Sequence, residues 1–391
     1  MNRDYSLDIL RGIMLLIMAA DHFGEPIFQH LYEFAGYLSA AEGFVFLSGM
    51  LVALVYSRYQ TQGGWLLEQK VWQRAAVIYG YHLAVVGAVF VFTLLSVLAG
   101  ASWQSFATEM ELEPLAALLS ALVLVYQPPM LDILPMYVLL MLGAPLALRL
   151  MLRFKRLGVA SVLAGSILLW VFAHQGAWHW LLQALPSRML VRVGAFDYLA
   201  WQLIFVLGMV AGFLRFTQQR KLGTINKPLF LMALSVIIFL FLLRHGYLKP
   251  TSFLGGVWLV EYPHIARDNI GWLRLVNFLA FVYVIAGFIH LHHQYKIFQP
   301  LSLLGRWLGF LGQHSLQVFA FHLVVLYCYI PFRWGDWALT DNQKWIGLAI
   351  FLASLALPAN LHARYQRQKR QTLVRSPMPT TQLSATIQLV H

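Results

Sequence analysis

The chain has 391 residues, of which 60% are hydrophobic and only 11% are charged, and its formal net charge is +12. A soluble domain carries about a quarter charged residues, so the composition excludes that class and indicates a polytopic membrane protein. The basic excess is typical of loops that face anionic lipid headgroups and does not indicate a nucleic-acid partner. The single cysteine, Cys328, excludes an intrachain disulfide.

In chain order, apolar runs of membrane-crossing length predict an all-α fold with about ten transmembrane helices. The predicted spans are residues 8–28, 36–57, 72–99, 131–150, 157–175, 198–216, 226–245, 271–292, 309–331 and 343–361. The apolar run at 112–127 is too short for a span, and we expect a short interfacial or re-entrant helix there. Residues 1–361 therefore form one transmembrane domain. The polar, basic segment 362–391 is expected to be a disordered cytoplasmic tail.

The basic residues predict the orientation of the chain. Ten spans with a cytoplasmic N-terminus place most of the 28 Lys and Arg residues in cytoplasmic loops, as the positive-inside rule requires. A full span at 112–127 would reverse every later loop and put the basic loops outside. We therefore expect a multi-pass protein with both termini in the cytoplasm.

The first predicted span, LDILRGIMLLIMAADHFGEPIF, carries Asp8, Arg11, Asp21, His22 and Glu25. Charged side chains are costly in hydrocarbon and usually mark a functional site. Arg11 and His22 are eleven positions apart, so they share one helix face and lie about 16 Å apart along the axis. Arg suits phosphate and His moves protons near neutral pH. The pair favours a ligand with a phosphorylated head and a long arm, such as acyl-CoA. In the alternative interpretation Arg11 snorkels to the interface and pairs with Asp8.

Polar residues at matching depths extend this site into two tiers. Arg11 and Arg74 form an inner cationic tier, although snorkelling accounts equally well for Arg74. The outer acid/base tier contains the residues that we expect to be catalytic, namely His22, Asp21, Glu42 and His322.

The candidate substrate-binding residues are Ser48, Asp132, Asp197, Trp201, Gln202 and Gln317. Asp132 and Asp197 are expected where spans begin on the outside, so either could instead cap a helix. Trp201 suits a sugar ring but also an interfacial belt, and Ser48 could bond its own helix backbone. The HLHHQ run favours interfacial histidines, and we predict no metal site.

Five motifs in order resemble the OpgC family over about residues 3–361: LDILRGIMLLIMAADH, AAEGFVFLSGM, DILPMY, FDYLAWQLIFVLG and HSLQVFAFH. The chain is more broadly similar to membrane acyltransferase-3 proteins and to heparan-glucosaminide acetyltransferase, whose first span carries an Arg and a His with this spacing. The OpgC family is associated with succinylation of osmoregulated periplasmic glucans.

The resemblance implies transfer of a succinyl or acetyl group from cytosolic acyl-CoA to a hydroxyl of an extracytoplasmic glycan, such as a periplasmic glucan. It implies a bacterial inner-membrane location, His22 as the catalytic base and Arg11 as a coenzyme A contact. It also implies acyl-CoA as the donor substrate, and no permanently bound cofactor is expected. The expected partners are the glycan acceptor, the lipid bilayer and glucan-synthesis proteins.

Two other function classes stay open. Intramembrane charges also serve a transporter or flippase for a glycan or a lipid-linked precursor. A non-catalytic subunit of a glycan-modification complex would tolerate loss of His22. Dependence on acyl-CoA separates the enzyme from both alternatives.

Overall fold

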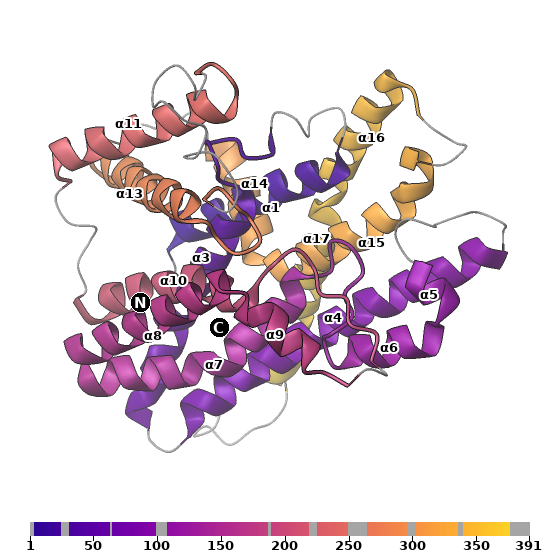
Figure 1. Cartoon of the computed structure of the whole chain (residues 1–391), viewed down its shortest axis with the longest axis horizontal. Helices are drawn as coiled ribbons and strands as arrows, with labels where there is room; N and C mark the ends of the chain where they lie inside the picture. The colour runs from indigo at the N-terminus through magenta and orange to yellow at the C-terminus, as the bar shows by residue number, and fades with distance from the viewer. Residues whose placement is uncertain are drawn as a thin grey trace.

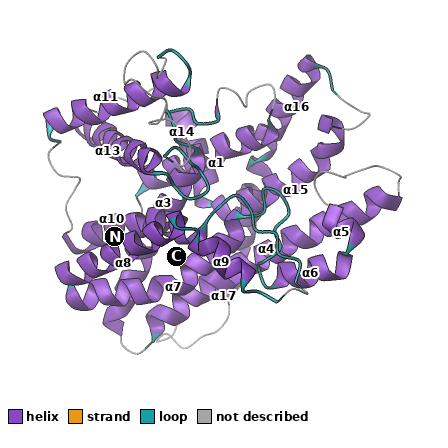
Figure 2. Cartoon of the chain, viewed as in Figure 1, coloured by secondary structure: helices purple, strands orange, loops and turns teal. Residues whose placement is uncertain are grey.

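The computed structural model describes residues 4–24, 31–62, 65–98, 108–186, 189–218, 225–248, 264–295, 302–334 and 339–375. Helices dominate these segments (Figure 2), and the described part of the chain contains no strand. An isolated parallel β-bridge joins Tyr126 and Arg192 in the described part of the chain. The predicted all-α class is therefore confirmed.

The helices follow one another along the chain, and Figure 1 shows how they are arranged, with α3 packed on α10, α4 on α7 and α11 on α13. Their bounds are α1 Tyr5–Phe23, α3 Ala40–Tyr56, the 3-10 helix η1 Ser57–Gln62, α4 Leu66–Leu98, α5 Thr108–Leu112, α6 Pro114–Leu122, α7 Ile133–Phe154, α8 Arg156–His174, α9 Ala177–Gln183, α10 Tyr198–Gln218, α11 Lys227–Arg244, α13 Trp272–Tyr295, α14 Ser302–Gln313, α15 Ser315–Trp334, α16 Asp341–Ser354 and α17 Ala356–Arg375.

Eight segments of the described chain are long and apolar enough to cross a bilayer, and the bent pair α14–α15 would make a ninth. The polytopic membrane class is thus confirmed, but the number of candidate spans is eight or nine where ten were predicted. Helix α1 is not among them. It has 19 residues, yet Asp8, Arg11 and Asp21 lower its apolar character.

Two predicted spans differ from the structure in their form. Helix α1 ends at Phe23, not at residue 28, because Gly24 follows it with a φ of 87°, which glycine adopts without strain. The predicted continuous span 309–331 is broken at His314, where α14 and α15 meet at 85°. Apolar composition alone cannot signal such a break, because the helices on both sides of it are apolar. Residues 25–28 lie outside the described residues.

The predicted tail boundary is wrong for residues 362–375, since α17 continues through them to Arg375. Lys, Arg and Gln are good helix formers, so a helix that has already begun extends into this polar segment. Residues 376–391 lie outside the described residues. The run at 112–127 contains the nine-residue helix α6, which is too short to span a bilayer, as predicted.

Glycines allow the central helices to approach closely. A Cβ at Gly208 of α10 would collide with the Phe46 carbonyl of α3, and one at Gly49 of α3 would collide with the Phe205 carbonyl of α10. Helix α1 packs on α14 in the same way, because a Cβ at Gly12 would meet the Leu308 carbonyl. Small residues are the usual means of bringing helix backbones together in membrane proteins.

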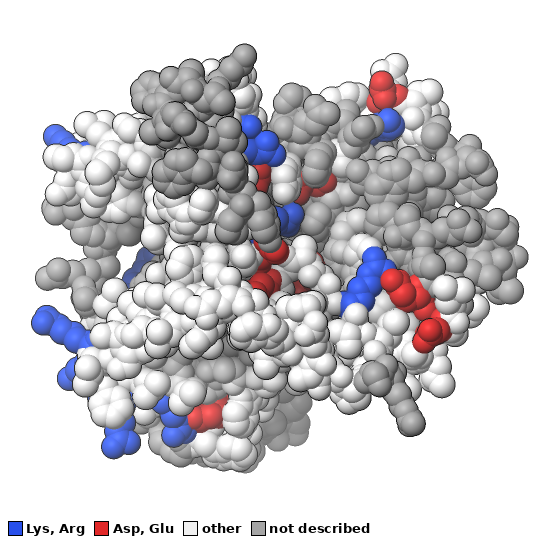
Figure 3. All heavy atoms as spheres, in the orientation of Figure 1, with Lys and Arg blue, Asp and Glu red and all other residues white. Residues whose placement is uncertain are grey.

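Ion pairs join segments that the positive-inside rule assigns to the same side. Arg215 pairs with Asp4 and Arg149 with Glu68, all in segments predicted to be cytoplasmic. Arg244 pairs with Glu33, in segments predicted to be external. Figure 3 shows acidic and basic side chains meeting in the middle of the face that it draws, while other basic side chains lie at the left and lower rim.

We expect Gly208→Ala to destabilise the protein, because the added methyl group must displace the Phe46 carbonyl. Overpacking of this kind costs about 1–3 kcal/mol. Gly165→Ala in α8 is the matched control, since nothing lies within 4 Å of its added Cβ. The thermal midpoint in detergent should fall for Gly208→Ala and stay level or rise for Gly165→Ala. Equal midpoints would contradict the assigned α3–α10 packing.

Candidate active site

Two histidines from helices far apart in the sequence meet at the outer tier. His22 Nδ1 in α1 lies 3.2 Å from His322 Nε2 in α15, and the two rings stack with centroids 5.4 Å apart. A hydrogen bond between two ring nitrogens needs one donor and one acceptor, so the pair shares a single proton along this contact. This geometry allows one imidazole to accept a proton while the other orients it.

A chain of aromatic contacts connects this histidine pair to Arg11. The Phe319 ring lies edge-on to His322 at 4.8 Å and stacks on Phe44 at 6.0 Å. The Arg11 guanidinium lies over the other end of the chain, 5.7 Å from the Phe44 centroid. Arg11 and His22, which share one face of α1, are therefore linked by apolar rings, Phe44 of α3 and Phe319 of α15.

The inner tier contains more polar residues than the two predicted arginines. Arg11 donates a hydrogen bond to the Ser315 hydroxyl at the start of α15. Next to it, His314 Nδ1 lies 2.9 Å from His362 Nδ1 of α17. Because the helix is broken at His314, Ser315 at the start of α15 can contact Arg11, and His314 can contact His362 of α17.

Gln317, a candidate substrate-binding residue, belongs to this inner cluster. Its amide nitrogen donates to the Tyr81 hydroxyl at 3.0 Å and lies 3.5 Å from His362 Nε2. Arg74 lies two turns before Tyr81 on the same face of α4. It is close enough to His362 to interact with it electrostatically. The structure thus gathers Arg11, Arg74 and Gln317 around the junction of α14, α15 and α17.

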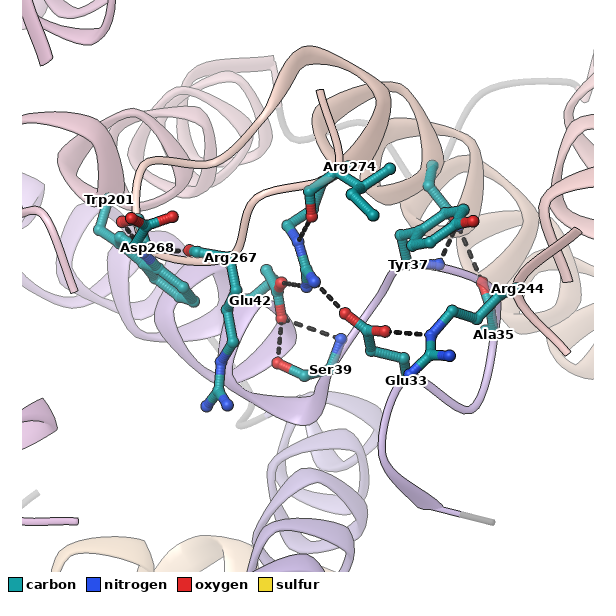
Figure 4. Close-up of polar contacts among 12 residues, drawn as sticks. Glu33, Ala35, Tyr37, Ser39, Glu42, Trp201, Arg244, Arg267, Asp268 and Arg274 are labelled. Atoms are coloured by element: carbon teal, nitrogen blue, oxygen red, sulfur yellow. Dashed lines mark hydrogen bonds and ion pairs between the residues drawn. The ribbon is translucent and has the colours of Figure 1, made fainter. Parts of the chain in front are cut away.

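Glu42 has a structural partner that the sequence analysis missed. Figure 4 shows Arg274 of α13 between Glu42 and Glu33, with Nη1 donating to Glu42 Oε1 at 2.6 Å. Glu33 also pairs with Arg244, and Glu42 accepts a bond from the Ser39 backbone N–H at 3.0 Å. Arg274 and Glu42 are fully buried. The geometry makes Glu42 a charged helix cap and ion-pair partner.

Asp197 and Trp201 make structural contacts at the start of α10. Asp197 caps this helix, and Trp201 holds the loop before α13 in place. Asp197 caps α10 by accepting from Leu199 N at 2.9 Å, and burial raises the pKa of its carboxyl. Trp201 is fully buried and its indole donates to the backbone carbonyls of Arg267 and Asp268, both at 3.0 Å. Because the indole is buried, it has no exposed face on which a sugar ring could stack. Its hydrogen bonds to the loop take the place of the sugar contact that we expected.

Two of the remaining candidate residues, Gln202 and Asp132, also have internal hydrogen bonds. Gln202 exchanges hydrogen bonds with Ser166, accepting from its hydroxyl at 2.7 Å and donating to its carbonyl at 2.8 Å. The Asp132 carboxylate accepts from Ala195 N at 3.1 Å, and burial raises its pKa. The Ser48 hydroxyl is buried and has no hydrogen-bond partner within the described segments.

A small pocket opens beside His22. It is lined by Asp21, His22, Ser39 and Arg267 together with apolar side chains, and its volume of about 10 Å³ corresponds to roughly one water molecule. Asp21 and His22 are therefore in one pocket, as their adjacency in the sequence suggested. Arg267 lies on the loop before α13, and no motif in the sequence signalled it. No group of three His, Cys, Asp or Glu side chains among the described residues could hold a metal ion.

Taken together, the fold and the site define a helical membrane protein with a pair of contacting histidines and a separate inner cationic cluster. The chain matches the OpgC protein family over residues 3–369 and belongs to that family. The family name and the membrane-helical fold fit a membrane acyltransferase. A search of curated proteins and a search of solved structures each gave no match.

We expect Glu42→Ala to lower stability strongly, because it removes one of the two carboxylates that compensate the buried Arg274 charge. Breaking a buried ion pair costs about 3–5 kcal/mol. Asp341→Ala is the control, since its pair with Lys344 is exposed and worth at most about 1 kcal/mol. Thermal unfolding of the purified variants measures both effects, and an unchanged midpoint for Glu42→Ala would refute the assigned role.

Proposed function

We propose that this protein transfers an acyl group from acyl-CoA to a hydroxyl group of a glycan on the opposite side of the membrane. The observation that carries the proposal is the contact between His22 and His322, with Arg11 at the other end of the same helix face. A proton acceptor and a fixed cation about 16 Å apart along one helix match the two ends of an extended acyl-CoA.

In this proposal the inner cluster binds the phosphorylated head of the donor. Arg11 supplies a guanidinium that suits phosphate, and Ser315 fixes its position by accepting a hydrogen bond. Arg74 adds a second cation at the same junction of helices. The pantetheine arm then extends along the apolar side chains between the two tiers, with Phe44 and Phe319 on its path.

The reaction takes place at the histidine pair. The glycan hydroxyl oxygen attacks the thioester carbonyl carbon while His22 takes the hydroxyl proton, and His322 orients His22 through their shared hydrogen bond. The new C–O ester bond forms as the C–S bond breaks. The thiolate of coenzyme A leaves with the bonding electron pair and receives the proton that His22 had accepted.

The acceptor in this proposal is a periplasmic glucan and the membrane is the bacterial inner membrane. The segments with the inner cluster are those that the positive-inside rule assigns to the cytoplasm, where acyl-CoA is made available. The histidine pair belongs to the side on which Glu33 and Arg244 lie, which the same rule places outside. Donor and acceptor thus approach one site from opposite sides.

We expect His22→Ala to abolish acyl transfer and retain donor binding, because it removes the base but leaves the inner cluster intact. Loss of a general base reduces the rate about 100- to 10,000-fold. Release of coenzyme A and acylation of a glucan oligosaccharide by purified protein measure transfer, and thermal stabilisation by acyl-CoA measures binding. His179→Ala is the matched control, since His179 is exposed on α9.

We expect Arg11→Ala to give the opposite pattern, with binding of acyl-CoA weakened and little direct effect on the bound donor's reactivity. The inner and outer tiers would then be separable by their effects on KM and kcat. Wild-type protein that is folded but neither binds nor cleaves acyl-CoA would contradict the proposal. Transport of the glucan would become the favoured function.

A further inference from the structure

The two nitrogens of the His322 ring have different neighbours. Its Nε2 atom lies 3.2 Å from His22 Nδ1 of α1. The same ring is within hydrogen-bonding reach of the backbone carbonyls of Val318 and Phe319, four and three residues back in α15. Nδ1 is the ring nitrogen nearer the backbone, so it is the atom that faces these carbonyls. His322 is thus tied to its own helix by one nitrogen and to α1 by the other.

These two contacts assign the proton of His322. A backbone carbonyl only accepts hydrogen bonds, so the ring nitrogen that faces it must carry the N–H. His174 is arranged in this way in α8, where its Nδ1 lies 2.9 Å from the Trp170 carbonyl four residues back. His322 is 1% exposed, and burial away from water favours a neutral ring over a charged one. A neutral imidazole has a single N–H, so His322 Nε2 carries a lone pair.

The lone pair of His322 in turn determines the tautomer of His22. Because His322 Nε2 can only accept, His22 Nδ1 must donate the hydrogen bond that joins the two rings. The bond made by one ring nitrogen decides the state of the other, so a neutral His22 with its proton on Nδ1 has its lone pair on Nε2. Nε2 is therefore the atom of His22 that can take a proton from a hydroxyl group.

Aromatic packing holds the two histidines in this relative orientation. Their rings are stacked with an interplanar angle of 17°, and Phe319 lies edge-on to His322. Phe23, the residue after His22, stacks on Tyr329 of α15 with ring centroids 4.3 Å apart. The end of α1 is thereby fixed against α15 beside the histidine contact. A catalytic group that packing already holds in place needs no reorientation before it reacts.

We propose that His322 is a positioning residue that holds His22 in the tautomer with an unprotonated Nε2, which makes Nε2 of His22 the atom that accepts the proton of the acceptor hydroxyl. The inference rests on the proposed acyl transfer and names the atoms that perform it. The pocket lined by His22 has room for roughly one water molecule, which is also the room that one hydroxyl oxygen needs.

The proton follows one path in this proposal. It moves from the hydroxyl to His22 Nε2 while the oxygen forms the ester bond, and the same atom then gives it to the departing thiolate of coenzyme A. In the interval His22 is an imidazolium, whose Nδ1–H bond to His322 becomes charge-assisted and therefore stronger. His322 neither gains nor loses a proton in these steps.

Two amide variants of His322 separate the roles of its two nitrogens. A Gln side chain is long enough to place its carbonyl oxygen where His322 Nε2 lies, so His322→Gln keeps an acceptor for His22 Nδ1–H. An Asn side chain reaches only the position of Nδ1, so His322→Asn loses that acceptor. We expect His322→Asn to lower kcat for acyl transfer about 100- to 10,000-fold, the range for a base that is lost or wrongly protonated. His322→Gln should keep kcat within about 10-fold of the wild type, because one neutral acceptor replaces another.

Donor binding separates a positioning role from a role in folding. Acyl-CoA should raise the thermal midpoint equally in the wild type and in both variants, because neither substitution changes Arg11 or Ser315. The loss in His322→Asn should therefore appear in kcat and not in KM. His179→Asn is the matched control, since His179 is exposed on α9 and its substitution should leave both values unchanged.

A variant of the other histidine tests the direction of the contact without any change at His322. His22→Asn keeps an N–H donor near the position of Nδ1 but has no atom in place of Nε2. We expect it to bind acyl-CoA and to transfer no acyl group. This comparison supplies the answer if His322→Asn does not yield folded protein.

Three outcomes would overturn the inference. An equal loss of kcat in His322→Gln and His322→Asn would mean that His322 exchanges a proton itself, and an unchanged kcat in His322→Asn would mean that it does not orient the base. Transfer by His22→Asn would mean that the roles of the two histidines are reversed. In each of these cases acyl transfer itself still stands. Folded wild-type protein that neither binds nor cleaves acyl-CoA would instead remove the proposed function and this inference together.

Discussion

The buried ion pairs of Arg274 organise the outer half of this molecule. Arg274 joins Glu33 of the segment before α3 to Glu42 in the first turn of α3, and it does so from α13, more than 230 positions away in the chain. Because Glu33, Glu42 and Arg274 are buried away from water, each of these charges must be satisfied by the protein itself. The network thereby fixes Ser39 and the start of α3, which form one wall of the pocket beside His22.

The division of the site into two tiers follows from helix geometry. Helix α1 is held against α14 by the close approach at Gly12, and it presents Arg11 and His22 on one face. Helix α15 contributes to both tiers as well, through Ser315 near Arg11 and His322 at His22. The break at His314 is what allows this, because it frees the start of α15 from α14 and turns it toward α1. Each tier is therefore built from the same two elements, with Phe319 and Phe44 between them.

The sequence predicted the parts of this site that depend on spacing within one helix, but not those that depend on contacts between distant segments. The common face of Arg11 and His22 follows from helical periodicity. The similar depth of His22 and His322 was also predictable, and the structure places their rings in contact. Arg274 and Arg267 were missed because each acts across a long sequence separation and neither lies in a motif. The contacts of Trp201 and Gln202 could not be predicted either, since only the packed structure shows that Trp201 donates to the loop before α13 and that Gln202 hydrogen-bonds to Ser166 of α8. His362 was placed in a disordered tail, whereas α17 brings it to His314.

The central claim is that one site receives its donor from the Arg11 side and its acceptor from the His22 side. Protein reconstituted in liposomes in a known orientation tests this most directly, with acyl-CoA added on one side and a glucan oligosaccharide enclosed on the other. Acylation of the enclosed glucan only when acyl-CoA is on the Arg11 side is the predicted result. Acylation only when donor and acceptor share a compartment, or an equal rate from either side, would contradict the account.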